Sequence, residues 1–228
     1  MNFNEVFISQ LGDTAIIINF ENKIDETINS KVLHLFYQLK ERSFPFVKDI
    51  VPAYSSLVIF YDLLLLDNKN TLNRFSLKNF MNQIKKLMEE NIKISHLPSR
   101  KIKIPVCYSA KYALDLPEIS QQKNLSLDEI IKLHTAKKYR IYMIGFLPGF
   151  AYMGEVDERI AISRKAQPRK IVEAGSVGIA GKQTGIYPLD SPGGWQIIGK
   201  TPIKIFDKEK DDPVLLQAGD EIEFYSIT

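Results

Sequence analysis

The sequence is poor in the residues that bind structural metals or form disulfides. Its 228 residues include one cysteine, Cys107, and three histidines, His34, His96 and His134. A single cysteine cannot form an intramolecular disulfide, and these scattered side chains lack the spacing of a zinc site. We therefore expect a protein of the reducing cytoplasm that holds no structural metal.

Long apolar runs and dense basic blocks are also missing. No stretch approaches the roughly 18 apolar residues of a membrane span, and the run Leu63–Leu66 is bracketed by Asp62 and Asp67. The N-terminus has no basic start followed by an apolar run, as a secretion signal would. Thirty lysines and arginines against 27 acidic residues leave a net charge of +3. We expect no membrane insertion, no export and no nucleic-acid binding.

Glycine is scarce in the first 144 residues, where Gly12 stands alone, while the other eleven glycines lie between Gly145 and Gly219. The two parts of the chain are therefore built differently. Hydrophobic residues make up 45% of the sequence, which is enough to fill a core. We predict two domains, 1–98 and 99–228, joined by a hinge within Asn91–Arg100.

The first part alternates helical patterns with short strand patterns. Apolar residues recur at spacings of three and four from Ile24 and again from Leu77, where Ser76 is a suitable N-cap. Runs rich in β-branched and aromatic residues predict strands at 6–8, 15–20, 47–51 and 57–61. The order strand, strand, helix, strand, strand, helix favours a small α+β sandwich with helices on one face of a sheet.

The second part carries mostly strand patterns. Lys101–Val106 alternates lysine with isoleucine or valine, which is typical of a half-buried strand. After a loop, Ser126 and Glu129 form a capping box ahead of a helix that ends near Ala136. Further strand patterns occupy 139–144, 203–206 and 221–225. Frequent glycines and prolines between them favour a compact β-barrel with long loops.

The glycine string at 175–183 superficially resembles a phosphate-binding loop. Its first glycine is displaced to Gly175, and Gln183 follows Lys182 where such a loop needs a hydroxyl for magnesium. The string also lies among strand patterns instead of between a strand and a helix. A phosphate loop is therefore disfavoured, and the sequence contains no dinucleotide fingerprint, HExxH or GxSxG motif.

His134 has two interpretations. It lies one turn from the predicted helix end, where an imidazolium would neutralise the negative pole of the helix dipole, and this structural role is favoured. The alternative is proton transfer, because imidazole exchanges protons near neutral pH.

Arg164, Lys165, Arg169 and Lys170 form a basic cluster beside the glycine string. Charge alone favours an ordinary solvated face. Guanidinium groups next to unpaired backbone N–H groups, however, are also suited to binding carboxylate or phosphate.

Gln183 and Gln196 add neutral amides that can both donate to and accept from a small amide substrate. Trp195, which follows Gly193 and Gly194, is expected to pack in a core, with an aromatic wall of the site as the alternative.

Several strings carry a resemblance to a known family. They are GFLPGFAYMG at 145–154, AGSVGIAGKQTGIYPLDSPGGWQIIGKTP at 174–202, IPVCY at 104–108 and, less sharply, GDTAIIINF at 12–20 and VPAYSSLVIFYD at 51–62. The chain resembles the allophanate hydrolase subunit 1 family, also called the KipI or 5-oxoprolinase B-subunit family. The resemblance implies an α+β protein in which an N-terminal ferredoxin-like sandwich precedes a C-terminal cyclophilin-like β-barrel.

The resemblance also implies a function. Such a chain is the B-type component of an ATP-dependent 5-oxoprolinase, which opens the lactam of 5-oxoproline to give L-glutamate. It works with a KipA-like C-type component and a LamB/YcsF-like A-type component. The complex uses ATP with Mg²⁺, and the sequence does not identify which component binds them. The alternative is a KipI-type inhibitor that blocks autophosphorylation of a sporulation histidine kinase.

For the enzymatic function we predict a site in the second part of the chain. Two arginines would bind the carboxylate and phosphate, backbone amides of the glycine string would approach an oxyanion, and two glutamines would orient the amide. One histidine would transfer protons. The predicted substrate-binding residues are Arg164, Arg169, Gly178, Ala180, Gly181, Gln183 and Gln196, and the predicted catalytic residue is His134.

Overall fold

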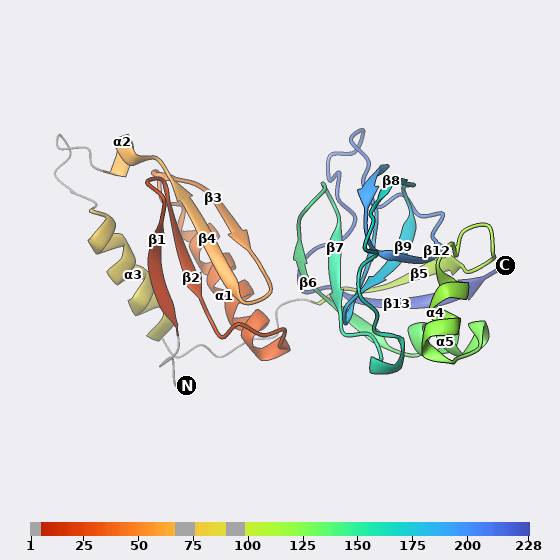
Figure 1. Cartoon of the computed structure of the whole chain (residues 1–228). Coiled ribbons are helices and arrows are strands. Elements are labelled where there is room, and N and C mark those ends of the chain that lie inside the picture. Colours follow the sequence, from red (N-terminus) through yellow and green to blue (C-terminus); the bar gives the residue numbers. More distant parts are fainter. Residues whose placement is uncertain (1–5, 67–75, 90–98) are drawn as a thin grey trace. The chain divides into compact units, whose positions relative to one another are not determined.

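The computed structural model describes residues 6–66, 76–89 and 99–228 (Figure 1). The chain divides into two compact units, Met1–Leu97 and Pro98–Thr228. Each unit has its own hydrophobic core. Most of the expected hinge, residues 91–98, lies outside the described residues.

The N-terminal unit is an antiparallel sheet with helices on one face (Figure 1). Its described strands pair in the order β1-β2-β4-β3. The elements are β1 (Phe7–Leu11), β2 (Ala15–Asn19), α1 (Glu26–Arg42), β3 (Val47–Pro52), β4 (Ser56–Tyr61), α2 (Leu63–Leu66) and α3 (Leu77–Glu89). The predicted element order is thereby confirmed.

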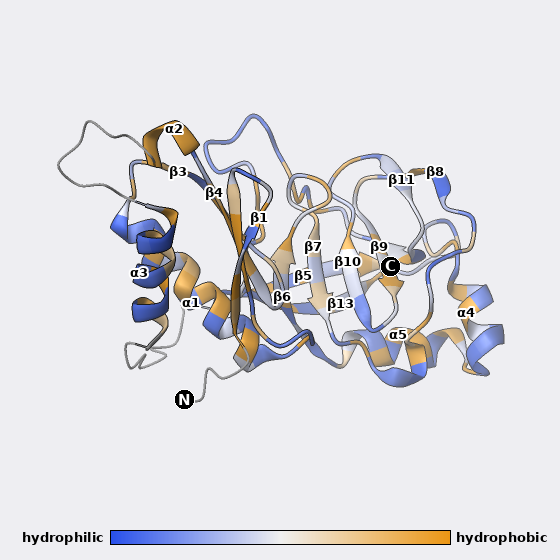
Figure 2. Cartoon of the chain, turned by 60° about the vertical axis from the view of Figure 1, so that its left-hand side comes forward, coloured by the Kyte–Doolittle hydropathy of each residue, from blue (hydrophilic) through white to orange (hydrophobic). Residues whose placement is uncertain are grey.

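Local sequence explains where α1 begins and which way it faces. Asp25 caps the helix, because its carboxylate accepts a hydrogen bond of 3.0 Å from the backbone N–H of Ile28. The apolar stripes of α1 and α3 cover the same sheet face, where Ile16 of β2 and Ile59 of β4 lie opposite each other and are fully buried. Figure 2 shows this division of hydrophobic and hydrophilic residues.

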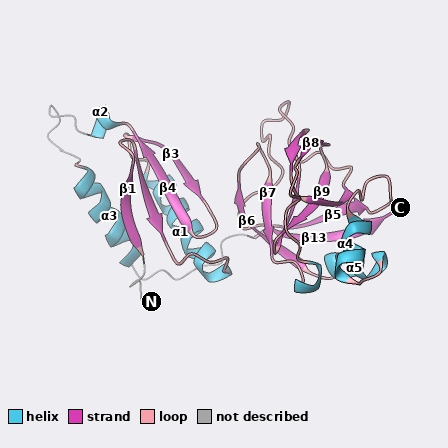
Figure 3. Cartoon of the chain, viewed as in Figure 1, coloured by secondary structure: helices cyan, strands magenta, loops and turns pink. Residues whose placement is uncertain are grey.

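The C-terminal unit is a closed, mixed β-barrel (Figure 3). Its strands pair in the order β10-β7-β6-β13-β5-β12-β9, with β13 parallel to β5 and antiparallel to β6. The barrel strands are β5 (Lys101–Cys107), β6 (Lys138–Ile144), β7 (Ala151–Gly154), β9 (Ser176–Ala180), β10 (Gln183–Ile186), β12 (Gln196–Lys200) and β13 (Glu221–Ile227). The α+β class, with a helix-covered sheet followed by a barrel, is confirmed.

Smaller elements surround the barrel. They are α4 (Leu116–Lys123), α5 (Leu127–Thr135), the 3₁₀ helix η1 (Glu158–Ile160) and a separate two-stranded sheet of β8 (Arg169–Val172) and β11 (Ser191–Gly193). The capping box of α5 is confirmed: the Ser126 hydroxyl accepts from the Glu129 N–H at 3.2 Å, and the Glu129 carboxylate accepts from the Ser126 N–H at 2.8 Å.

Two expectations were wrong. The segment before α5 was expected to be a loop, but it contains α4. The segment 203–206 was expected to be a strand, but it forms a single isolated bridge, between Phe206 and Val214. Its apolar alternation arises because Ile203 and Ile205 pack on the barrel core from a loop.

The described helices include none long and apolar enough to cross a membrane.

Candidate functional site

A polar pocket lies against the C-terminal unit between α4 and the loop that follows η1. Its volume is about 690 Å³, within the range of ligand sites. The lining residues are Glu118, Gln122 and Lys123 of α4, the segment 161–167, and Gln196 at the start of β12. The pocket therefore collects residues separated by about eighty positions in the sequence.

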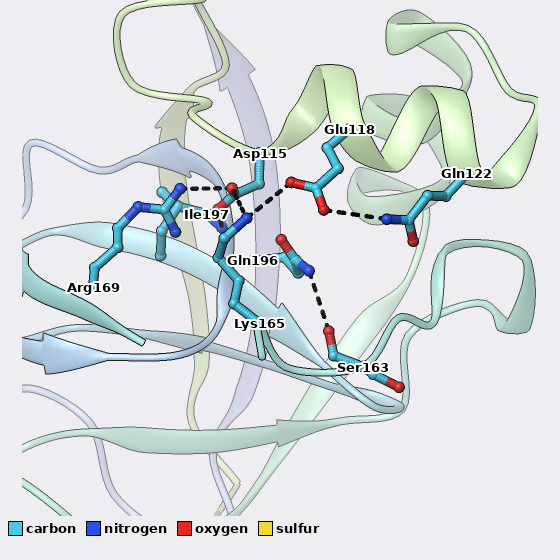
Figure 4. Close-up of polar contacts among 8 residues, drawn as sticks. All are labelled: Asp115, Glu118, Gln122, Ser163, Lys165, Arg169, Gln196 and Ile197. Atoms are coloured by element: carbon cyan, nitrogen blue, oxygen red, sulfur yellow. Dashed lines mark hydrogen bonds and ion pairs between the residues drawn. The ribbon is translucent and has the colours of Figure 1, made fainter. Parts of the chain in front are cut away.

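A buried carboxylate holds the basic loop in place beside this pocket (Figure 4). One oxygen of Asp115 accepts from the Lys165 ammonium at 2.9 Å and from the Arg169 guanidinium at 2.6 Å. Its other oxygen accepts from the backbone N–H of Ile197 at 2.6 Å. Asp115 occupies the N-cap position of α4 but makes no side-chain cap bond, because its carboxylate is directed to these three donors.

The charge of this carboxylate is stabilised by its donors. Burial alone would raise the pKa of Asp115, but hydrogen bonds from Arg169, Lys165 and the Ile197 N–H together hold that pKa below its ordinary value. Lys165 also donates to Glu118 at 2.8 Å, and the two carboxylates raise the pKa of its ammonium. Asp115 is therefore ionised and Lys165 protonated at neutral pH.

Gln196 is the most deeply buried polar residue of the pocket, with 4% of its surface exposed. Its amide nitrogen donates to the carbonyl of Ser163 at 3.3 Å, which fixes the orientation of the amide. Its amide oxygen is buried and lies within hydrogen-bonding distance of no described protein group. Gln196 thus holds a buried hydrogen-bond acceptor that has no partner among the described protein groups.

Arg164 lines the same pocket and is exposed. Its guanidinium lies over the Trp195 ring, 5.9 Å from the centroid. Trp195 is 4% exposed and packs with Phe150 and Tyr187 in a separate core cluster, so the favoured core interpretation is confirmed. Stacking on this fixed ring orients the guanidinium, and among the described residues no acidic side chain forms an ion pair with it.

Arg169 has a different environment from Arg164. One of its terminal nitrogens is bound to Asp115, and the other is buried with no described hydrogen-bond partner. The residue does not line the pocket. Its charge is therefore largely matched within the protein, whereas the charge of Arg164 is open to a ligand.

The glycine string forms barrel strands instead of a ligand loop. Gly178 and Ala180 lie in β9, which pairs with β10 on one side and β12 on the other. Gly181 forms the turn that follows, and its N–H donates to the Ile162 carbonyl at 2.7 Å. Gln183 begins β10 opposite Ala180 and is half-buried. None of these four residues lines the pocket, and their binding roles stay predictions.

His134, near the end of α5, lies fully buried. Its two ring nitrogens contact the hydroxyls of Tyr108 at 2.8 Å and Thr184 at 2.9 Å, and its ring stacks on Phe224. Burial lowers the pKa of His134 to about 3, so the ring is neutral at pH 7. A neutral ring cannot neutralise the helix dipole. Its catalytic role stays a prediction, and its surroundings are those of a packed core.

The structure thus brings two of the predicted residues, Arg164 and Gln196, to one pocket and places Arg169 beside it.

The chain is similar to known proteins over the part that forms this site. Residues 6–216 match the carboxyltransferase domain, subdomains C and D. The 5-oxoprolinase B subunit of Bacillus subtilis is 39% identical over 222 residues, covering 97% of this chain and 92% of that protein. The chain belongs to the 5-oxoprolinase B-subunit family.

Other members and structures support this family assignment. The Escherichia coli 5-oxoprolinase B subunit is 33% identical over 94% of this chain and 93% of its own length. The crystal structure of TTHA0988, at 33% identity, has a TM-score of 0.80 over 94% of this chain. This chain spans 40% of that longer protein. The resemblance seen in the sequence strings is confirmed.

In this member of the B-subunit family, sequence reasoning missed the acidic half of the site. Asp115 and Glu118 were assigned to a loop and given no role. Their signal was present, since Asp115, Pro117 and Glu118 stand at positions typical of a helix start. Nothing local, however, indicates that the Asp115 carboxylate reaches Lys165, fifty residues later.

Proposed function

We propose that the chain is the B-type component of an ATP-dependent 5-oxoprolinase that converts 5-oxo-L-proline to L-glutamate. The observation that carries the proposal is the 39% identity with a 5-oxoprolinase B subunit over 97% of this chain. The proposed partners are a KipA-like C-type component and a LamB/YcsF-like A-type component, in the cytoplasm.

The pocket supports this proposal through its charge. Asp115 and Glu118 match the charges of Lys165 and Arg169. Arg164 and Lys123 also line the same space, and neither forms an ion pair with an acidic side chain of the described residues. The pocket is therefore suited to an anionic ligand, and we place the 5-oxoproline carboxylate at Arg164.

The chemistry explains why the reaction needs ATP and several proteins. A five-membered lactam is a resonance-stabilised amide and a poor electrophile. Transfer of the γ-phosphoryl group to the lactam oxygen releases ADP and activates the carbon. Water then adds to that carbon and the ring C–N bond breaks, which leaves an acyl phosphate and a free amine. A second water hydrolyses the acyl phosphate to L-glutamate and phosphate. In this scheme the proton-transfer role of His134 and the oxyanion role of the glycine-string amides stay predictions.

Reconstitution of the complex from its three purified components tests the proposal. Glutamate release from 5-oxoproline and ATP is measured for the full mixture and for mixtures that omit one component. We expect release from the full mixture and its loss when this chain is omitted. Release that is unaffected by the omission would contradict the proposal. Suppression of histidine kinase autophosphorylation by this chain, in a parallel assay, would favour the inhibitor function.

A further inference from the structure

We propose that the same pocket also holds the phosphate chain of the nucleoside triphosphate, with the Lys123 ammonium as its cation. The inference rests on the proposed function and extends it, because it places the phosphoryl donor as well as 5-oxoproline on this chain. The sequence analysis assigned the phosphate to an arginine, whereas in the structure Arg169 is bound to Asp115 and does not line the pocket.

The first step is the size of the pocket. Its volume of about 690 Å³ lies well within the range that accommodates drug-sized ligands. 5-Oxoproline is far smaller, since it consists of a single five-membered ring with one carboxylate. The pocket therefore has room for a second ligand group beside it.

The second step is the charge of the lining. The charged residues that line the pocket are three cations and one carboxylate: Lys123, Arg164, Lys165 and Glu118. Beside them, Asp115 and Arg169 form an ion pair whose charges cancel. The lining thus has two positive charges in excess, and the carboxylate of 5-oxoproline matches one of them. A second anionic group is needed to match the other.

The third step identifies the cation that remains. Lys165 is already bound to the carboxylates of Asp115 and Glu118, at 2.9 and 2.8 Å (Figure 4). Arg164 is assigned to the substrate carboxylate. Lys123, the last residue of α4, is half-buried and forms no ion pair with an acidic side chain of the described residues. Among the described lining residues, its ammonium is therefore the cation left for a second anion.

The fourth step identifies that anion from the reaction. The lactam oxygen attacks the γ-phosphorus, the bond from this phosphorus to the bridging oxygen breaks with its electron pair remaining on ADP, and the ring N–H proton passes to water. The reacting atoms must lie about 3 to 3.5 Å apart before such a step. One small ring carries both the lactam oxygen and the carboxylate, so a carboxylate at Arg164 keeps that oxygen in this pocket. The γ-phosphate must then enter the same pocket, where an ammonium stabilises its charge.

The test measures nucleotide binding directly, on the full three-component complex. The Kd of the non-hydrolysable analogue AMPPNP with Mg²⁺, the KM for ATP and the KM for 5-oxoproline are determined for wild type, Lys123→Met, Lys123→Arg and the control Lys132→Met. Lys132 is an exposed lysine in the last turn of α5 and does not line the pocket. Since Lys123 also lies at a helix end, this control accounts for the loss of a charge that stabilises the helix dipole.

We expect Lys123→Met to raise the Kd for AMPPNP and the KM for ATP by about tenfold or more, because a charged hydrogen-bond donor is lost. The KM for 5-oxoproline should stay within about threefold of the wild-type value. Lys123→Arg keeps the positive charge and should keep most of the affinity for the nucleotide. Lys132→Met should match wild type in all three constants.

A second measurement uses the wild-type complex, so it does not depend on the folding of a variant. An amine-acylating reagent modifies accessible lysines, and mass spectrometry of the resulting peptides gives the rate of modification at each one. With AMPPNP at roughly ten times its Kd, acylation of Lys123 should slow by about tenfold, and acylation of Lys132 should not change.

The inference is overturned if Lys123→Met binds AMPPNP as tightly as wild type, or if AMPPNP leaves the acylation of Lys123 unchanged, since the phosphate would then be held elsewhere. It is also overturned if the variant weakens both substrates equally, because the lysine would then only shape the pocket. A wild-type complex that releases no glutamate from 5-oxoproline and ATP would refute the proposed function instead, so the two failures are distinguishable.

Discussion

His134 donates a hydrogen bond from its Nε2 atom to the hydroxyl of Thr184, 2.9 Å away. The direction follows from the network, since the Thr184 hydroxyl gives its own proton to the Gly178 carbonyl at 3.1 Å. The other ring nitrogen of His134 then accepts from the Tyr108 hydroxyl at 2.8 Å. The buried imidazole is therefore held as a single neutral tautomer.

This neutral histidine predicts a pH-dependent stability of the C-terminal unit. The pKa of His134 is about 3 in the folded state, against about 6.5 in the unfolded state. Between these values the unfolded chain binds the extra proton, so stability is lost as the pH falls below 6.5. The expected loss is about 2 kcal/mol between pH 7 and pH 5. Urea unfolding followed by the fluorescence of Trp195, the only tryptophan, measures it.

The matched variant is His134→Gln, which has no group that titrates in this range. Its unfolding free energy should change less between pH 7 and pH 5 than that of wild type. His134 is the only histidine of the C-terminal unit, so no other imidazole contributes to the Trp195 signal. Equal pH dependence in both proteins would show that the buried histidine is not the cause.

A second prediction concerns the carboxylate that holds the basic loop. Asp115 is 2% exposed and compensates two cations, whereas the Glu118 side chain is 46% exposed. Asp115→Asn should lower the free energy of unfolding by about 2 kcal/mol, because Lys165 and Arg169 lose a buried counter-charge. Glu118→Gln should cost less than about 1 kcal/mol. Thermal unfolding of the two variants, followed by Trp195 fluorescence, compares their stabilities. Similar losses of stability in both variants would contradict the role of Asp115 in holding the basic loop.

A third prediction separates two arginines that the sequence analysis assigned to the same role. Arg164 lines the pocket with its charge unpaired, so Arg164→Ala should raise the KM for 5-oxoproline by about tenfold or more. Arg169 is bound to Asp115, so Arg169→Ala should mainly lower thermal stability. Lys170→Ala, a neighbouring exposed residue outside the pocket, serves as the control. A larger KM effect at Arg169 than at Arg164 would reverse the assignment.

A fourth prediction tests whether glycines within and just after the glycine string serve packing. A Cβ at Gly185 would lie 2.8 Å from the carbonyl oxygen of Ala151 and 3.1 Å from the Trp195 ring. Gly185→Ala should therefore destabilise the barrel by about 2 kcal/mol through overpacking. A Cβ at Gly181 would meet open space, so Gly181→Ala should cost about 1 kcal/mol through its positive φ alone. Urea unfolding ranks the two, and an equal or reversed ranking would refute the packing explanation.

Local patterns predicted most of the fold because they act over a few residues. The stripes of α1 and α3 and the capping box of α5 depend on neighbours within one or two turns, and each is present. The pattern at 203–206 was misleading, since an apolar loop packed on a core shows the same alternation as a strand.

The site was less predictable because it depends on contacts that the fold creates. The sequence identified Arg164 and Gln196 as polar groups near a glycine string, and both line the pocket. No local pattern indicates that Asp115 pairs with Arg169, 54 positions away. Glycines near the string also have packing roles that no spacing reveals: a Cβ on Gly193 would collide with the ring and hydroxyl of Tyr187, so only glycine fits where the chain passes that side chain.

The parallel pairing of β13 with β5 has a consequence for how the barrel is made in the cell. Glu221–Ile227, the last barrel strand along the sequence, fills the gap between β5 and β6. Until the ribosome has released these residues, both neighbouring strands present unpaired edges, which are prone to join other chains. The barrel therefore cannot close before residues 221–227 have emerged from the ribosome, and a nascent chain that stalls before residue 221 leaves a sheet open to aggregation.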